Sequence, residues 1–457
     1  MGDTMEKIIK KLMDMGAEYC DIRYEKRTGL SLEVKDGELK KAVSGSEEGV
    51  GIRVLYNGAF GFFSTNNVSD ADKAAGIAFK LAKCSKPKEK LRLADVKTVK
   101  DKIIWKPKRN PIDVSVDEKH KLIAGMDEAM RGIEGILTVT TGYSDGNVEM
   151  HFLSSEDSDI STSVPRVVAQ ADLIAKKDEN LVGYRVRVGG TSGFEIFERN
   201  DPLEKGVNAA KSAVRILSAE KSPSGRFPVI ANPDLAGVFA HEAIGHAAEA
   251  DAVTSGESVL EKKIGEKVAS GLVTIYDDPA MENGFGSFPY DDEGVKGSKK
   301  ILIENGVLKN FILSRETAYK LGMNPNGGAR AESYAVRPLV RMSNTMIEKG
   351  EHSFDELIED IKYGVYAKGT RGGQVDTAKG SFQFSAQEAF LIEKGEVTKP
   401  LKDLSLSGLT LETLKNIDGI GKDVRFGEPG FCSKGQLVPV GDGGPHIRIK
   451  NVLIGGG

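Results

Sequence analysis

The spacing of hydrophobic and polar residues changes several times along the first 85 residues. Four apolar residues recur at helical spacing among lysines, which predicts a helix over 5–15. The next two segments alternate around Asp36-Gly37 and Asn57-Gly58, dipeptides that are typical of two-residue hairpin turns. A second helix is expected over 71–84, with Ser69 as its cap. The chain therefore opens with a helix, antiparallel strands and another helix.

The segment 86–109 is rich in lysine and contains two prolines, so it is interpreted as a solvated connector. The alternative is a basic patch for nucleic acid, but a lone Trp105 gives no aromatic interleaving. Further on, a helix is expected over 115–131. It is followed by a hairpin around Asp145-Gly146, by more strands, and by a helix that starts at Asp201-Pro202.

The turn cluster Ser222-Pro223-Ser224-Gly225 marks the main expected domain boundary. It separates an N-terminal domain, 1–221, from a C-terminal domain, 222–457, with a possible sub-boundary near 86–112. After it, Asn232-Pro233-Asp234 has the cap, proline and acid that start a helix. Hairpins are predicted at Asn305-Gly306 and Lys394-Gly395, and short helices over 314–321 and 353–363. The expected fold class is α+β: an N-terminal α+β region with antiparallel strands, then a strand-rich domain around this central helix.

Composition excludes several classes of protein. The chain has 457 residues, enough for two or three domains, and a net charge of −4, which argues against a strongly electrostatic binder of nucleic acid or anionic membrane. Its three cysteines are odd in number and widely spread, so they form no disulfide framework, and a reducing cytoplasm is expected. No signal peptide and no membrane-spanning segment are predicted.

The central helix contains the strongest chemical signal, His241-Glu242 followed by His246. In the common zincin motif the histidines are four residues apart, whereas here they are five apart, which separates them by about 140° on a regular helix. A π-bulge at 243–245 would bring both rings to one face, and Gly245 has no side chain to resist it. The alternative is a helix with incidental histidines, which the unusual spacing keeps open.

A catalytic zinc ion needs a third protein ligand. Cys432 is the leading candidate because it lies in a Gly- and Pro-rich loop, where Lys434 would lower its pKa. Glu249 and His446 are fallback ligands, and Glu249 could instead orient a histidine from outside the ligand set. Cys20 and Cys84 are expected to be small core residues.

Two segments, HEAIGHAAEAD and CSKGQLVPVGDGGP, resemble the TldD/PmbA family, also called TldD/TldE, and the resemblance extends along the chain. It implies a zinc-dependent peptidase whose Zn²⁺ is held by His241, His246 and Cys432, with Glu242 as the base. The PmbA/TldE-type partner lacks these residues, so this chain is similar to the catalytic TldD type. One departure is Ala250, where the family usually has glycine.

The resemblance further implies hydrolysis of unfolded or leader-type peptides by a metal-activated water. The expected partner is a second copy or a PmbA/TldE-like paralogue, with no membrane and no nucleic acid. A substrate backbone could approach Gly369–Gly373 by adding a strand, although ordinary tight turns explain these glycines equally well. The alternative function is a non-catalytic regulator, of the gyrase or toxin–antitoxin kind, with a structural metal closed by His446 or Glu249.

Overall fold

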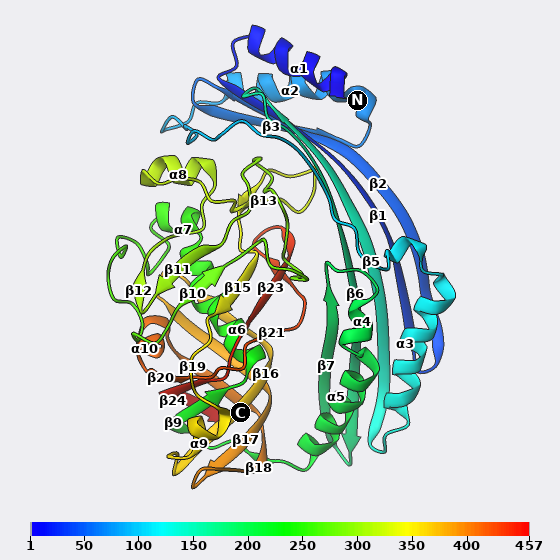
Figure 1. The fold of residues 1–457 in the computed structure, drawn as a ribbon, viewed down its shortest axis with the longest axis vertical. Helices are drawn as coiled ribbons and strands as arrows, with labels where there is room; N and C mark the ends of the chain where they lie inside the picture. The colour runs from blue at the N-terminus through cyan, green and yellow to red at the C-terminus, as the bar shows by residue number, and fades with distance from the viewer. Residues whose placement is uncertain (1, 457) are drawn as a thin grey trace.

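The computed structural model describes residues 2–456, and it confirms the α+β class. One large sheet has the strand order β3-β2-β1-β5-β6-β4, with β7 added beside β6. Figure 1 shows its long strands curving past the C-terminal half of the chain. The strands are β1 (Tyr19–Lys35), β2 (Glu38–Tyr56), β3 (Ala59–Thr65), β4 (Lys100–Ile104), β5 (Ile136–Ser154), β6 (Asp159–Lys177) and β7 (Asn180–Gly190).

The first two hairpins form where the sequence predicts them. Asp36 and Asn57 have φ angles of 50° and 47°, and the glycine after each also has a positive φ. Positive φ at both central residues is the geometry of a type I′ turn, whose twist matches that of the flanking strands.

The hairpin predicted at Asp145-Gly146 is wrong, because β5 runs through this dipeptide without a turn. Asp145 lies between Leu30 of β1 and Val167 of β6. Its carboxylate is 2.7 Å from the buried Lys119 ammonium and accepts a hydrogen bond from the Tyr143 hydroxyl. Paired on both sides and neutralised, the dipeptide stays extended despite its turn propensity.

Two groups of helices cover the large sheet at separate cores. At one end lie α1 (Gly2–Asp14) and α2 (Ala71–Cys84), and at the other lie α3 (Val116–Arg131) and α5 (Pro202–Leu217), preceded by the short α4 (Ile196–Arg199).

The expected cap Ser69 is wrong: Asn67 caps a 3₁₀ turn before α2 instead. Cys84, expected in the core, is exposed because it ends α2 on the solvent side. The connector over 86–109 contributes β4, which pairs in parallel with β6.

The C-terminal half contains two further large sheets around a buried helix, α6 (Pro233–Ala240). One has the order β16-β9-β24-β19-β17-β18-β8, with β20 beside β24, and the other β12-β11-β10-β15-β23-β21, with β22 beside β23. The first comprises β8 (Glu220–Lys221), β9 (Gly225–Ala231), β16 (Tyr363–Asp376), β17 (Ser381–Glu393), β18 (Glu396–Lys402), β19 (Leu404–Leu409), β20 (Ile417–Ile420) and β24 (Ile447–Gly456). The second comprises β10 (Ile275–Asp277), β11 (Lys300–Glu304), β12 (Val307–Leu308), β15 (Asn344–Ile347), β21 (Arg425–Phe426), β22 (Gly430–Ser433) and β23 (Leu437–Gly444).

The remaining elements are short. They are α7 (Ala250–Thr254), α8 (Arg315–Leu321), α9 (Phe354–Ile358), α10 (Thr410–Lys415) and the strand pair β13 (Ala329–Arg330) and β14 (Leu339–Val340). Both α8 and α9 begin with a capping box, which the sequence predicts at Ser353. The helix expected over 353–363 is too long, because α9 ends at Ile358 and β16 begins at Tyr363. No helix among residues 2–456 combines the length and apolarity needed to cross a membrane. The division at 221/222 stays a prediction.

Candidate metal centre

The turn that carries both histidines is a π-helix, as the five-residue spacing predicts. Strand β9 leads into α6, which Asn232 caps by accepting a hydrogen bond from the Leu235 amide. At His241 the helix widens, and the backbone N–H of His246 donates to the carbonyl of His241. This i to i+5 bond places the two rings on one side, with their centroids 5.1 Å apart.

Gly245 is required at this turn for a packing reason that the sequence does not reveal. A Cβ at this position would lie 1.9 Å from Sδ of Met342. Met342 is itself buried in the C-terminal core, so any side chain at 245 would displace it or the turn.

Cys432 reaches the histidines from a strand, not from the loop expected for it. It lies in β22, which pairs with β23 around a turn at Gly435, whose φ is 72°. Its Sγ is 3.2 Å from Nε2 of His246. Ligand atoms of His241, His246 and Cys432 all lie within 4.8 Å of one another. The structure thus brings Cys432 beside two histidines that lie 191 and 186 positions before it in the sequence.

The electrostatics of the three groups favour a thiolate. Burial raises the pKa of the Cys432 thiol, but hydrogen bonds from His241 and His246 outweigh it and lower the pKa to about 5. Burial lowers the pKa of His246, yet the carboxylate of Glu249 and the thiol raise it well above its usual value. Lys434 is expected from the sequence to lower the pKa of the Cys432 thiol, but its ammonium forms ion pairs with Glu249 and Asp251 instead.

Glu249 contacts the Nδ1 atom of the His246 ring. It is 1% exposed, and its Oε2 lies 3.0 Å from Nδ1 of His246 and 3.0 Å from Nζ of Lys434. Lys434 also donates to both oxygens of Asp251 at 2.7 Å. Arg341 donates to the carbonyl of Cys432, which ties the β22 backbone to the same network. Glu249 thus contacts Nδ1 of His246, whereas Nε2 of the same ring faces Cys432, and an orienting role for Glu249 stays a prediction.

Glu242 lies on the more open side of the turn. Its side chain is 27% exposed, and its Oε2 is 3.8 Å from Nε2 of His246. Near it, Nδ1 of His241 and Oδ1 of Asp442 are both buried without a hydrogen-bond partner. Asp442 sits against α6, where the absence of a side chain at Gly237 leaves room for its carboxylate. No local pattern in the sequence singles out Asp442, because its place beside α6 depends on how β23 packs against that helix.

His446, the other fallback ligand, lies outside the group. Its Nδ1 is 2.7 Å from Asp423 and its Nε2 is 3.0 Å from the Tyr366 hydroxyl, so both ring nitrogens are engaged.

The donor set fits a catalytic zinc ion. Two imidazoles and one thiolate are common zinc ligands, and three protein ligands leave one coordination position open. Nδ1 of His241 is buried without a hydrogen-bond partner, as expected of a ring nitrogen that a metal ion would satisfy. The assignment of these residues as ligands stays a prediction.

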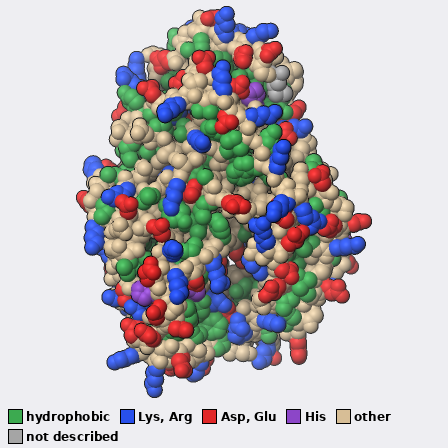
Figure 2. Space-filling view, in the orientation of Figure 1, with side chains coloured by type: hydrophobic (Ala, Val, Ile, Leu, Met, Phe, Trp, Pro, Cys, Tyr) green, Lys and Arg blue, Asp and Glu red, His purple; other side chains and the backbone are tan. Residues whose placement is uncertain are grey.

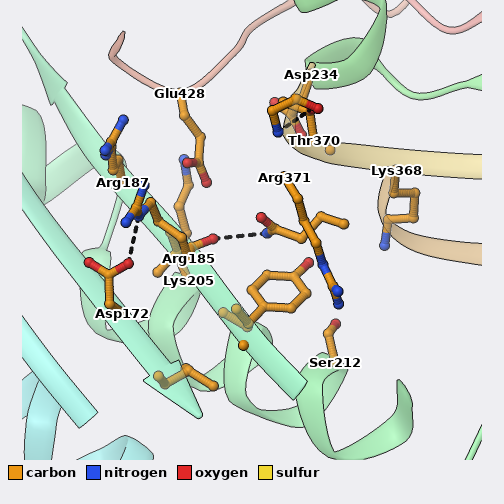
Figure 3. Close-up of a pocket in the computed structure, with 18 of the residues that line it drawn as sticks. Asp172, Arg185, Arg187, Lys205, Ser212, Asp234, Lys368, Thr370, Arg371 and Glu428 are labelled. Atoms are coloured by element: carbon orange, nitrogen blue, oxygen red, sulfur yellow. Dashed lines mark hydrogen bonds and ion pairs between the residues drawn. The ribbon is translucent and has the colours of Figure 1, made fainter. Parts of the chain in front are cut away.

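A cavity of about 900 Å³ lies between the two halves of the molecule and comes near the metal centre at Val238 and Asp442, without being lined by the histidines or the cysteine. Figure 3 shows Glu428 beside Arg187 and Lys205, with Arg371 farther along the cavity. Its wall includes Asp442, and Gly430 of the strand that carries Cys432. The face in Figure 2 mixes basic and acidic side chains, without a broad basic area.

Three family profiles match this chain. They describe domain 1, the central domain and the C-terminal domain of PmbA/TldA metallopeptidases, over residues 20–82, 109–217 and 224–456. A metalloprotease of Methanothermobacter thermautotrophicus is 46% identical over 455 residues, which cover 99% of each chain. A zinc metalloprotease TldD homologue of Saccharolobus solfataricus is 35% identical, over 99% of this chain and 100% of its own.

Solved structures share the fold. TldE from Thermococcus kodakarensis superposes with a TM-score of 0.80 at 22% identity, covering 99% of this chain and all of that one. A Thermotoga maritima protein, whose description names modulation of a DNA gyrase as a suggested role, gives a TM-score of 0.83 at 24% identity, with 99% and 100% covered. At these identities the likeness concerns the fold alone.

Proposed function

Because this chain belongs to the PmbA/TldA metallopeptidase family, we propose that it is a zinc-dependent peptidase that hydrolyses unfolded or leader-type peptides. The observation that carries the proposal is the convergence of His241, His246 and Cys432 beside a partly exposed Glu242. The family relatives supply the reaction class, and the donor set supports zinc.

In this proposal the two imidazoles and the thiolate hold Zn²⁺. When bound, zinc acidifies a water molecule and polarises a carbonyl oxygen. Glu242 takes the proton from the attacking water and delivers it to the departing amine. Glu249 keeps His246 oriented by accepting a hydrogen bond at Nδ1.

The substrate would reach this centre through the cavity between the two halves. An extended peptide has unpaired backbone groups, and β16 lines the cavity with Lys368–Gly372. A strand of this kind binds a peptide through its backbone and reads little sequence. This arrangement suits unfolded chains better than folded ones.

We place the reaction in the cytoplasm, where Cys432 would stay reduced and available to the metal. The peptidase would work with a second chain of the family, either another copy or a PmbA/TldE-like paralogue.

The experiment measures zinc content and cleavage of an unfolded peptide on the same preparations of the parent, Glu242→Gln and Cys432→Ser. Glu242→Gln should keep zinc near one per chain and lose about 10²–10⁴-fold in rate, the usual contribution of a general base. Cys432→Ser should lose most of the zinc. Cleavage by Glu242→Gln at the parent rate would refute the mechanism, and tightly held zinc without any cleavage by the parent would favour the regulator.

A further inference from the structure

A second cavity, of about 410 Å³, lies between the large sheet and the hairpin of β22 and β23. Residues of β1, β5 and β6 form one wall, and residues of the hairpin and of the segments 285–292 and 330–332 form the opposite one. It shares no wall residue with the cavity proposed for the substrate backbone. Its volume is within the range of pockets that hold a small organic group.

The strand that carries Cys432 also contributes an aromatic side chain to this second cavity. Phe431 precedes Cys432 in β22, and neighbouring side chains of a strand point to opposite faces, so Phe431 faces away from the histidines. Its ring contacts that of Phe285 edge-on, with the centroids 5.3 Å apart. Phe431 nevertheless stays 53% exposed, and Leu437, which lines the same cavity, is 47% exposed. This wall therefore has apolar surface left to cover a ligand.

Arg166 of β6 reaches across the cavity to the opposite wall. Its Nε donates to the carbonyl of Phe285 at 2.9 Å, and its Nη2 donates to the carbonyl of Ser287 at 2.8 Å. Its Nη1 makes no hydrogen bond, and its guanidinium forms no ion pair, within residues 2–456. Neutral carbonyls hold this cation in place without neutralising it.

A second arginine lies on the opposite wall of the same cavity. The guanidinium of Arg330 lies over the ring of Phe288, 4.9 Å from its centroid, and donates to the carbonyl of Pro439 at 2.8 Å. It also forms no ion pair in the part of the chain that the structure describes. Burial and the guanidiniums of Arg330 and Arg27 lower the pKa of Arg166 to about 9. An anion in this cavity would offset that cost.

The carboxylates on the cavity walls are engaged elsewhere. They belong to Glu25, Asp145, Asp291, Asp292 and Glu332. Glu25 forms an ion pair with Arg27, and Asp292 forms one with Arg23. Asp145 pairs with Lys119, and the carboxylate of Asp291 accepts only backbone N–H groups. The exposed Glu332 accepts a hydrogen bond from the backbone N–H of Leu437 at 3.0 Å. None of the five forms an ion pair with Arg166 or Arg330.

The combination of aromatic walls and an unpaired guanidinium specifies the ligand. The C-terminal residue of a peptide carries its side chain and its carboxylate on the same carbon atom. An apolar side chain could then pack on Phe285 and Phe431 while the carboxylate accepts a hydrogen bond from Nη1 of Arg166. Hydrogen bonds between a guanidinium and a carboxylate are among the strongest in proteins. An acidic side chain brings the same charge but no apolar group on that residue.

We propose that this cavity binds the C-terminal residue of a peptide with an apolar side chain, the carboxylate on Arg166 and the side chain against Phe285 and Phe431. The choice of a peptide rests on the proposed function, whereas the binding is measured without cleavage. A protein that holds no zinc or cleaves nothing would refute the peptidase and leave this binding result standing.

The test titrates the full-length protein with four small probes in a calorimeter. N-acetylphenylalanine should bind. N-acetylphenylalanine amide, which lacks the carboxylate, and N-acetylalanine, which lacks the ring, should each bind about tenfold more weakly or worse. The α-amide of N-acetylglutamate, with its carboxylate on the side chain, should be equally weak. No binding of N-acetylphenylalanine, or binding of its amide or of the glutamate probe with the same affinity, would overturn the proposal.

Two kinds of variant locate the binding. Val148→Glu puts a carboxylate on the sheet wall, opposite Val164 and on the same face as Arg166, and it removes no hydrogen bond. It should weaken N-acetylphenylalanine binding about tenfold by pairing with the arginine. Val43→Glu, the same change on an exposed position of β2, should bind like the parent.

The second kind changes the arginine itself. Arg166→Met should lose the binding, and Arg166→Lys, which keeps the charge, should recover part of it. Melting temperatures show whether each variant is folded. Parent-like binding by folded Val148→Glu or Arg166→Met protein would place the ligand elsewhere and overturn the proposal. The four probes on the parent decide it even where a variant fails to fold.

Discussion

Glu249 and Glu428 are two glutamates in very different surroundings: Glu249 is buried behind the metal centre, and Glu428 is half-buried on the cavity wall. Burial raises the pKa of Glu249, but His246 and Lys434 outweigh it and hold the pKa below its usual value. At Glu428, burial and the nearby Asp234 raise the pKa to about 8, and Arg187 counteracts this only in part. Glu249 is thus a permanent anion behind the metal centre, whereas Glu428 carries a proton on the cavity wall near neutral pH.

The difference teaches how each region is built. Behind the metal centre every charge has a nearby opposite charge, from His246 to Glu249, Lys434 and Asp251. The cavity wall has ion pairs of its own, Arg185 with Asp172 and Lys368 with Glu388, but no ion pair of Arg371 is formed among the described residues. The network behind the metal centre holds one geometry, while an unpaired arginine on the cavity wall is free to contact a bound chain.

The largest expected effect follows from removing the anion behind the metal centre. Glu249→Gln keeps the shape but loses the charge that orients His246, so zinc affinity should fall about 10–100-fold. Competition with a chelator measures this without any substrate. Asp251→Asn is the matched control: it touches Lys434 but neither histidine, so its zinc affinity should stay within about twofold of the parent. If the Glu249→Gln variant and the parent bound zinc equally tightly, the charge of Glu249 would not orient His246, and the contrast with Glu428 would fail.

A smaller effect is expected from the backbone that presents His246 to Glu249. Gly245→Ala would force its new Cβ against Met342, so unfolding should become easier by about 1–3 kcal/mol. Met342→Ala in the same chain should recover part of that loss by making room. Gly76→Ala in α2, where a Cβ meets nothing within 4 Å, should be neutral or slightly stabilising. Denaturant unfolding of the metal-free parent and of the three variants measures the free energy of unfolding. A Gly245→Ala variant as stable as the parent would contradict the packing argument.

The sequence predicts much of the metal centre because its strongest signal is local. The five-residue spacing and Gly245 lie within one turn, so helical geometry shows that a π-bulge is needed if both histidines are to share one face. The packing of Met342, the link from Lys434 to Asp251 and the strand that carries Cys432 depend on contacts far apart in the chain. The hairpin predicted at Asp145-Gly146 is wrong for the same reason, because pairing with β1 on one side and β6 on the other overrides the local turn preference. Glu428 and Asp442 gave no signal, because only the assembled cavity distinguishes them from other acids.

The smallest expected effect tests the cavity side of the comparison. An acid whose pKa rises from about 4.3 in the unfolded chain to about 8 in the folded protein binds its proton more tightly when folded. Its contribution to stability is therefore greatest at low pH and is lost as pH rises towards 8. Glu428→Gln cannot ionise, so its stability relative to the parent should grow by about 1 kcal/mol between pH 5 and 8. That figure is below the full linkage value, because the cavity admits water that screens the charge.

Glu396→Gln on the exposed part of β18 is the control and should show no such trend. If the stabilities of the parent and the Glu428→Gln variant changed with pH in the same way, Glu428 would be ionised near neutral pH as Glu249 is, and the contrast between the two glutamates would fail.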